Sequence, residues 1–195
     1  MLRSALGTAA RARRAHVGTR GLSSQLQSTH VGTWLRENAA SFAPPVMNKL
    51  LHREQLSVMF VGGPNKREDF HLEAGSEFFY QLKGDMELPI VHAGVREVIH
   101  IREGDVFLLP SCIPHSPQRP HEGSIGLVVE RQRYEDEPHD GLRFYQDFNT
   151  AKDVLWEKYF HCYDLGRDLV PVVQVRRACA VSMRGGGGRK VRRVW

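Results

Sequence analysis

The amino-acid sequence predicts an all-β fold: a single small barrel or sandwich with short flanking helices and disordered basic tails. Short segments in which apolar and polar residues alternate recur through the middle of the chain, with turn residues between them. No helical pattern intervenes between these segments, as is typical of β-barrels. The chain has 195 residues and is 41% hydrophobic. This length and this hydrophobic fraction suffice for one core in a domain of about 110 to 140 residues.

The first expected elements lie before residue 66. A short helix is expected around residues 33–40, and residues 57–61 form the first alternating strand. This strand ends at residues 62–65, a Gly-Gly-Pro-Asn cluster. Glycine there allows positive φ, and proline lacks the N–H that a strand ladder needs.

The next two strands are expected at residues 78–82 and 86–91, on either side of a Lys-Gly-Asp turn. This arrangement predicts a β-hairpin. Pro89 lies within the second strand and predicts an edge or a bulge, because proline cannot donate to a ladder. Further strands, separated by turn glycines, are expected at residues 95–101, 106–109 and 125–131.

A helix is expected near the end of the domain. Thr150 and Asp153 have the spacing of a capping box, and residues 154–160 would place four apolar side chains along one side of a helix.

The net charge of +5 comes from the two ends of the chain, since residues 1–36 and 176–195 are rich in arginine and contain no acid. The middle is mildly acidic, so no nucleic-acid partner is expected. Residues 1–32 are interpreted as a basic extension, either a mitochondrial presequence or an added upstream segment. Residues 173–195 are a Gly/Arg-rich tail expected to be disordered. The folded domain is therefore placed at residues 33–172.

The three cysteines form no CxxC pair. This disfavours a disulfide framework and a structural zinc site, and it suits a reducing compartment. Cys112 is expected to be a buried residue at a strand end. No apolar run approaches the roughly 18 residues of a membrane span, so no membrane partner is expected.

Two short segments, residues 69–77 and 110–119, carry the candidate chemistry. They offer two histidines, His71 and His115, and one carboxylate, Glu77. Two neutral imidazoles and one carboxylate leave about half of the octahedral coordination sphere of Fe(II) open for a substrate and dioxygen. Glu77 lies six residues after His71, whereas His115 has to come from a distant strand, as a small antiparallel barrel allows.

The same segments resemble the two motifs of the cupin superfamily. The first motif appears as Asp69, His71, Glu77 and Gly84, and the second as Gly104, Pro110 and His115. The resemblance implies a cupin barrel. Asp69 stands where most cupins have their first metal histidine, so a site with three ligands replaces the usual four.

Longer phrases resemble the 3-hydroxyanthranilate 3,4-dioxygenase family over about residues 33–172. They lie at residues 44–50, 61–65, 77–85, 107–119, 126–131 and 140–145. The resemblance implies an Fe(II) enzyme of the kynurenine pathway, on the route from tryptophan to quinolinate and NAD. It would open the ring of 3-hydroxyanthranilate with both atoms of O2, giving 2-amino-3-carboxymuconate semialdehyde.

The resemblance also implies roles for individual residues. His71, Glu77 and His115 would bind Fe(II), and Glu77 would also touch the substrate. Arg119 would hold the substrate carboxylate, where a planar guanidinium makes paired hydrogen bonds, and Glu130 would contact the substrate amine. Arg67 would lie beside the bound dioxygen. Asn48 and Asp69 would line the pocket or support the residues that do.

Alternatives stay open at this point. Arg67, in a charged loop, has an alternative interpretation as a solvated arginine. A cupin with another small-molecule substrate would keep the metal ligands without needing Arg67, Arg119 and Glu130 together. Animal members of the family continue into a second, degenerate cupin domain, so a truncated and inactive product is a further hypothesis. The resemblance implies a cytosolic protein, with a mitochondrial location as the alternative, and either a monomer or a homodimer.

Overall fold

The computed structural model describes residues 27–42, 47–163, 167–169, 171, 172 and 174. The chain divides into two compact units, Met1–Glu37 and Asn38–Trp195. Most of the predicted N-terminal extension and nearly all of the C-terminal tail lie outside the described residues. None of the described helices is long and apolar enough to cross a membrane.

The first unit contains helix α2 (Val31–Glu37). His30, just before this helix, caps its N-terminus, because the Nδ1 atom of His30 accepts a hydrogen bond from the backbone N–H of Thr33 at 3.2 Å. The second unit begins with a short 3-10 helix, η1 (Ala39–Phe42). The short helical segment expected around residues 33–40 is thus confirmed, although it divides between the two units.

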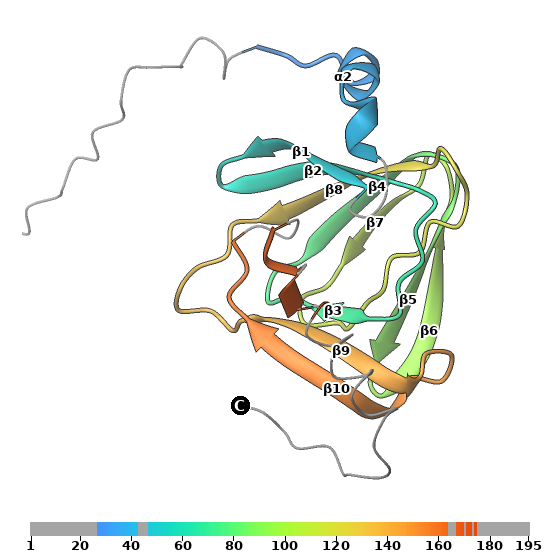
Figure 1. Cartoon of the computed structure of the whole chain (residues 1–195), viewed down its shortest axis with the longest axis vertical. Helices are drawn as coiled ribbons and strands as arrows, with labels where there is room; N and C mark the ends of the chain where they lie inside the picture. The colour runs from blue at the N-terminus through green and yellow to red at the C-terminus, as the bar shows by residue number, and fades with distance from the viewer. Residues whose placement is uncertain (1–26, 43–46, 164–166, 170, 173, 175–195) are drawn as a thin grey trace, which may run out of the picture. The chain divides into compact units, whose positions relative to one another are not determined.

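The regular structure described in the second unit consists mainly of strands (Figure 1). Its described residues include ten strands: β1 (Asn48–Arg53), β2 (Leu56–Gly62), β3 (Phe70–Leu72), β4 (Glu77–Lys83), β5 (Met86–His92), β6 (Val95–Ile101), β7 (Val106–Leu109), β8 (Ile125–Arg131), β9 (Asp140–Asp147) and β10 (Lys152–Phe160). They form sheets in the orders β1-β2-β8-β4-β7, β10-β9-β3 and β5-β6. The all-β prediction is confirmed, and β6, β7 and β8 have the predicted bounds.

The predicted hairpin between β4 and β5 is wrong. Gly84 makes the expected turn with φ of 65°, but β4 pairs with β7 on one side and β8 on the other. Both edges of β4 are therefore occupied, and β5 pairs with β6 instead. Pro89 lies in this two-stranded sheet, and residues 114–118 form backbone hydrogen bonds with the other side of β5, so the predicted open edge is not found there.

The helix predicted from the capping-box pattern is also wrong, because β10 occupies that segment and pairs with β9. The register shifts between Val154 and Trp156, which marks an irregularity in the ladder. Such a bulge breaks strict alternation and leaves neighbouring apolar residues in a row, a pattern that a short helix also produces. Val154 is 43% exposed, so the predicted apolar side does not form.

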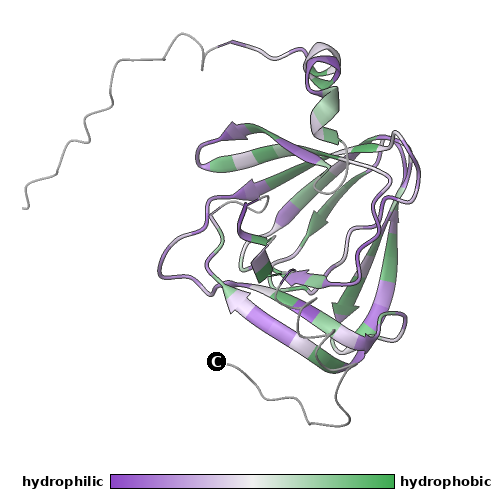
Figure 2. Ribbon diagram, in the orientation of Figure 1, coloured by the Kyte–Doolittle hydropathy of each residue, from purple (hydrophilic) through white to green (hydrophobic). Residues whose placement is uncertain are grey.

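Two apolar clusters form the core. The larger contains Phe79, Met86, Leu88, Ile101 and Leu109, each at most 2% exposed, with three other buried residues. The smaller contains Leu142, Phe144 and Val172. Figure 2 shows hydrophobic residues spread along strands of all three sheets rather than gathered in one element. The interior also holds a group of buried polar side chains, and these form the candidate site.

Candidate metal centre

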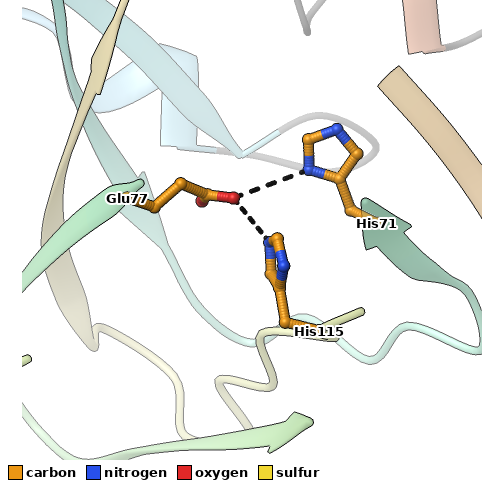
Figure 3. A group of neighbouring side chains, drawn as sticks. All are labelled: His71, Glu77 and His115. Carbon is orange, nitrogen blue, oxygen red and sulfur yellow. Dashed lines mark ion pairs between the residues drawn. The ribbon is translucent and has the colours of Figure 1, made fainter. Parts of the chain in front are cut away.

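His71, Glu77 and His115 converge inside the strand unit (Figure 3). His71 lies on β3, and Glu77 is the first residue of β4. His115 lies in the segment after β7 and is joined to β3 by reciprocal backbone hydrogen bonds with His71, at 2.8 and 3.0 Å. This isolated bridge is what brings His115 beside a residue 44 positions earlier.

The geometry of the three side chains suits a metal ion. Their ligand atoms all lie within 4.8 Å of one another. Glu77 Oε1 is 2.8 Å from His115 Nε2 and 3.8 Å from His71 Nδ1, and each side chain is at most 5% exposed. Among the described residues, no group donates a well-directed hydrogen bond to Glu77 Oε1. A buried carboxylate oxygen in this condition favours a cation as its partner.

Protonation at the site also suits a metal. Burial by itself opposes ionisation of Glu77, but His115 and His71 lower the pKa of this carboxyl to about 2. Burial lowers the pKa of His71, which favours the neutral imidazole. Burial also disfavours the charge on His115, but Glu77 beside it raises the pKa of His115. A metal would take the place of that proton, because metals bind carboxylates and neutral imidazoles.

Each imidazole is held at the nitrogen that faces away from Glu77. His71 Nε2 lies 2.7 Å from Asp140 Oδ2, and His115 Nδ1 lies 2.9 Å from the carbonyl oxygen of Ile113. Such partners fix the orientation and tautomer of a metal-binding imidazole. Asp140, the first residue of β9, was not predicted as a site residue, although it begins one of the phrases that carried the family resemblance.

Arg119 is buried without a counter-charge on two of its nitrogens. It is 1% exposed, and its Nε and Nη2 atoms have no hydrogen-bond partner among the described residues. Burial, and then the charge of Arg67, lower the pKa of Arg119 to about 10. Gly126 leaves room for this side chain, since a Cβ there would lie 2.7 Å from Nη2. A buried guanidinium with free donors is suited to an anionic ligand.

Arg67 and Asp69 form an ion pair with each other. Burial opposes the charge on Arg67, but Asp69 raises the pKa of its guanidinium, with smaller contributions from Glu77 and Glu130. Asp69, at the position where most cupins have a histidine, therefore belongs to this pair rather than to the cluster of His71, Glu77 and His115. The interpretation of Arg67 as a solvated surface arginine is wrong, since its side chain is only 25% exposed.

Glu130 lies on β8 directly opposite Glu77 on β4. It is 2% exposed, and burial and the charge of Glu77 raise its pKa to about 7. Glu73, which was not predicted as a site residue, is buried nearby, and burial and Glu130 raise its pKa to about 10. Arg133 binds both carboxylates. The raised pKa values reflect burial and the repulsion between neighbouring carboxyl groups, and a bound cation would reduce that repulsion.

Two further residues discussed in the sequence analysis are Asn48 and Cys112. Asn48 begins β1 opposite Val61 and is partly buried. Cys112 is exposed, and its φ of 61° places it in a turn, so the expectation of a buried strand-end cysteine is wrong.

Comparisons with known proteins agree with the resemblance to the 3-hydroxyanthranilate 3,4-dioxygenase family. A family model described as 3-hydroxyanthranilic acid dioxygenase matches residues 24–176. The chain is 56% identical over 144 residues to 3-hydroxyanthranilate 3,4-dioxygenase of Rattus norvegicus, a match covering 74% of this chain and 49% of that protein. For the enzyme of Homo sapiens, the identity is 54% over 144 residues, with the same coverage.

The chain spans about half the length of the curated relatives that it matches. Among solved structures, a cupin-2 domain containing protein from Shewanella frigidimarina aligns with a TM-score of 0.43 and 12% identity, over 57% of this chain and 100% of that one. That likeness is too weak to carry an argument. The family match and the sequence identity are decisive: the chain belongs to the 3-hydroxyanthranilic acid dioxygenase family.

Proposed function

We propose that this chain is a nonhaem Fe(II)-dependent dioxygenase that converts 3-hydroxyanthranilate and O2 to 2-amino-3-carboxymuconate semialdehyde. The observation that carries the proposal is the convergence of His71, Glu77 and His115 within 4.8 Å in the interior. The names of the relatives support the choice of substrate.

The residues present fit a metal ion. Two imidazoles held at their far nitrogens and one ionised carboxylate, whose oxygen faces both rings, are a suitable donor set for Fe(II). His71, Glu77 and His115 would hold the metal, leaving part of its coordination sphere open. When bound, the metal would supply the redox chemistry that ordinary side chains lack.

The protein's own contribution is to bind and orient the substrate. Arg119 would hold the carboxylate of 3-hydroxyanthranilate through the two nitrogens that lack partners. Glu130, on the neighbouring strand to Glu77, would accept a hydrogen bond from the aromatic amine. Two polar contacts at adjacent ring substituents would fix the ring in one orientation, which is how an enzyme gains from proximity.

Arg67 would add a fixed positive charge near the reacting oxygen. Its smaller electrostatic interactions with Glu77 and Glu130, which raise the pKa of Arg67, support this position. A preorganised cation stabilises negative charge that develops during the reaction. Asp69 would keep the Arg67 guanidinium in place through their ion pair.

Anaerobic loading tests the proposal. The purified protein is given Fe(II) and then 3-hydroxyanthranilate without air, and oxygen uptake and the absorbance of the ring-opened semialdehyde are followed after air is admitted. We expect one molecule of O2 to be consumed for each molecule of semialdehyde formed. Bound iron without turnover would point to another substrate, and failure to bind iron would contradict the metal site.

A further inference from the structure

Arg133 is the common partner of three buried carboxylates. Its Nη1 donates to Glu130 Oε2 at 2.9 Å, its Nη2 to Glu73 Oε2 at 2.9 Å, and its Nε to Asp140 at 2.8 and 3.0 Å. The Arg133 side chain is 13% exposed, and the three carboxylates are at most 3% exposed. All three nitrogens of one guanidinium are therefore used.

The three partners come from different parts of the fold. Glu130 lies near the end of β8, Asp140 begins β9, and Glu73 follows β3. Arg133 itself lies in the loop that joins β8 to β9 (Figure 1). One planar side chain thus ties together the two sheets that supply the candidate centre, because β8 belongs to the first sheet and β3 and β9 to the second.

The same contacts connect Arg133 to the candidate metal ligands, through Asp140, and to the proposed substrate position, through Glu130. Asp140 also lies 2.7 Å from His71 Nε2, so Arg133 helps set the carboxylate that orients this imidazole. Glu130 is the carboxylate that lies opposite Glu77 and, on the proposed function, faces the substrate amine. Lysine could not replace this arrangement, since an ammonium lacks the planar fork that makes several directed contacts at once.

We propose that Arg133 is a positioning residue that orients Asp140 behind the metal ligand His71 and Glu130 beside the substrate. The substrate half of this inference rests on the proposed function, whereas the metal half does not. Supporting residues of this kind change metal affinity or activity by about 10- to 100-fold when they are replaced.

The loop that carries Arg133 has its own support, which offers a matched control. Arg131 pairs with Glu137 through contacts of 2.7 and 2.5 Å and lies over the ring of Tyr134. Arg131→Met would remove the pair with Glu137 and the contact with Tyr134. It removes none of the groups that contact Arg133. It separates an effect of loop folding from an effect of the Arg133 guanidinium.

The test measures two equilibria without air: Fe(II) affinity by competition with a chromogenic chelator, and 3-hydroxyanthranilate affinity of the loaded protein by absorbance titration. In Arg133→Met, each affinity is expected to fall about 10- to 100-fold. Arg133→Lys keeps the charge and is expected to recover only part of each loss. Full recovery in the lysine variant would show simple charge compensation and would overturn the proposal. Equal losses of Fe(II) and substrate affinity in Arg131→Met would also overturn the proposal.

A double variant tests the path through Glu130. When Glu130→Gln is already present, adding Arg133→Met is expected to leave substrate affinity unchanged and still to lower Fe(II) affinity, because only the second effect passes through Asp140. Fully multiplicative losses of substrate affinity would contradict the proposal. If Arg133→Met does not fold, Arg133→Lys and Arg133→Gln enter the same comparisons.

The two proposals fail in different ways. If the wild-type protein binds Fe(II) but not 3-hydroxyanthranilate, the proposed function fails, and the Fe(II) measurements alone decide the role of Arg133. If the wild-type protein binds both and Arg133→Met changes neither affinity, only the role of Arg133 is overturned.

Discussion

Arg119, which is buried, and Arg133, which is partly buried, differ in how their charge is balanced. Arg133 is surrounded by three carboxylates, whereas Arg119 has two nitrogens without a partner among the described residues. An uncompensated buried charge is costly, and proteins keep such groups where a ligand supplies the counter-charge. Arg119 therefore has the features of a binding residue, and Arg133 those of a residue that shapes the site.

Replacing Arg119 is expected to separate stability from binding. Arg119→Met should raise the melting temperature of the ligand-free protein, because it removes a buried charge that has unpaired donors. It should also weaken 3-hydroxyanthranilate binding by at least about 10-fold while Fe(II) binding is retained. Thermal melting and anaerobic titration measure the two effects. Unchanged substrate affinity would refute the carboxylate role.

Replacing one metal ligand is expected to remove the metal. His115→Ala deletes one of the three proposed ligands and should abolish both iron retention and turnover. His100→Ala is the matched control, since the His100 side chain is 65% exposed on β6 and its substitution should change neither. The iron content of each variant after gel filtration measures iron retention. Full iron occupancy in the His115→Ala protein would show that the ligand assignment is wrong.

Strand β8 contributes to the site through a glycine. A Cβ at Gly126 would lie 2.6 Å from Gln81 Oε1 and 2.7 Å from Arg119 Nη2, closer than real Cβ contacts. Gly126→Ala should therefore displace Arg119 and lower substrate affinity without loss of Fe(II). Val129→Ala, on the outward face of the same strand, serves as the control, and anaerobic titration compares the two. Equal substrate affinity in both variants would contradict this role of Gly126.

The pairing of β3 with β9 supports His71. Leu142 on β9 is opposite His71 in the register and is fully buried. Leu142→Ala should lower the free energy of unfolding by about 2 to 5 kcal/mol, because it leaves a cavity, whereas Leu142→Met should cost less than about 1.5 kcal/mol. Urea unfolding measures both variants. Similar small losses in the two would mean that the smaller core cluster contributes little.

On the scale of the whole molecule, the metal is expected to stabilise the fold. A ligand that binds only the folded state at 100 times its dissociation constant adds about 2.7 kcal/mol. Fe(II) added without air should therefore raise the melting temperature of the wild-type protein, and the same addition to His115→Ala should not. An equal shift in the two proteins would indicate metal binding outside the candidate centre.

The sequence by itself determined the three candidate ligands and most of the central strands. His71, Glu77 and His115 are recognisable because motif spacing and the chemistry of imidazole and carboxylate ligands are local properties of the chain. Strands such as β6, β7 and β8 were predicted with their bounds, since regular alternation reports which side of a strand is buried.

Only the tertiary structure decided the pairing of strands and the contacts behind the ligands. The turn at Gly84 suggested a hairpin, but both edges of β4 are taken by β7 and β8. The bulged strand β10 resembled a helix in sequence, and its pairing with β9 determines its conformation. Asp140 and Arg133 make contacts that join separate sheets. No local pattern reports such contacts, because they depend on which distant segments the fold brings together.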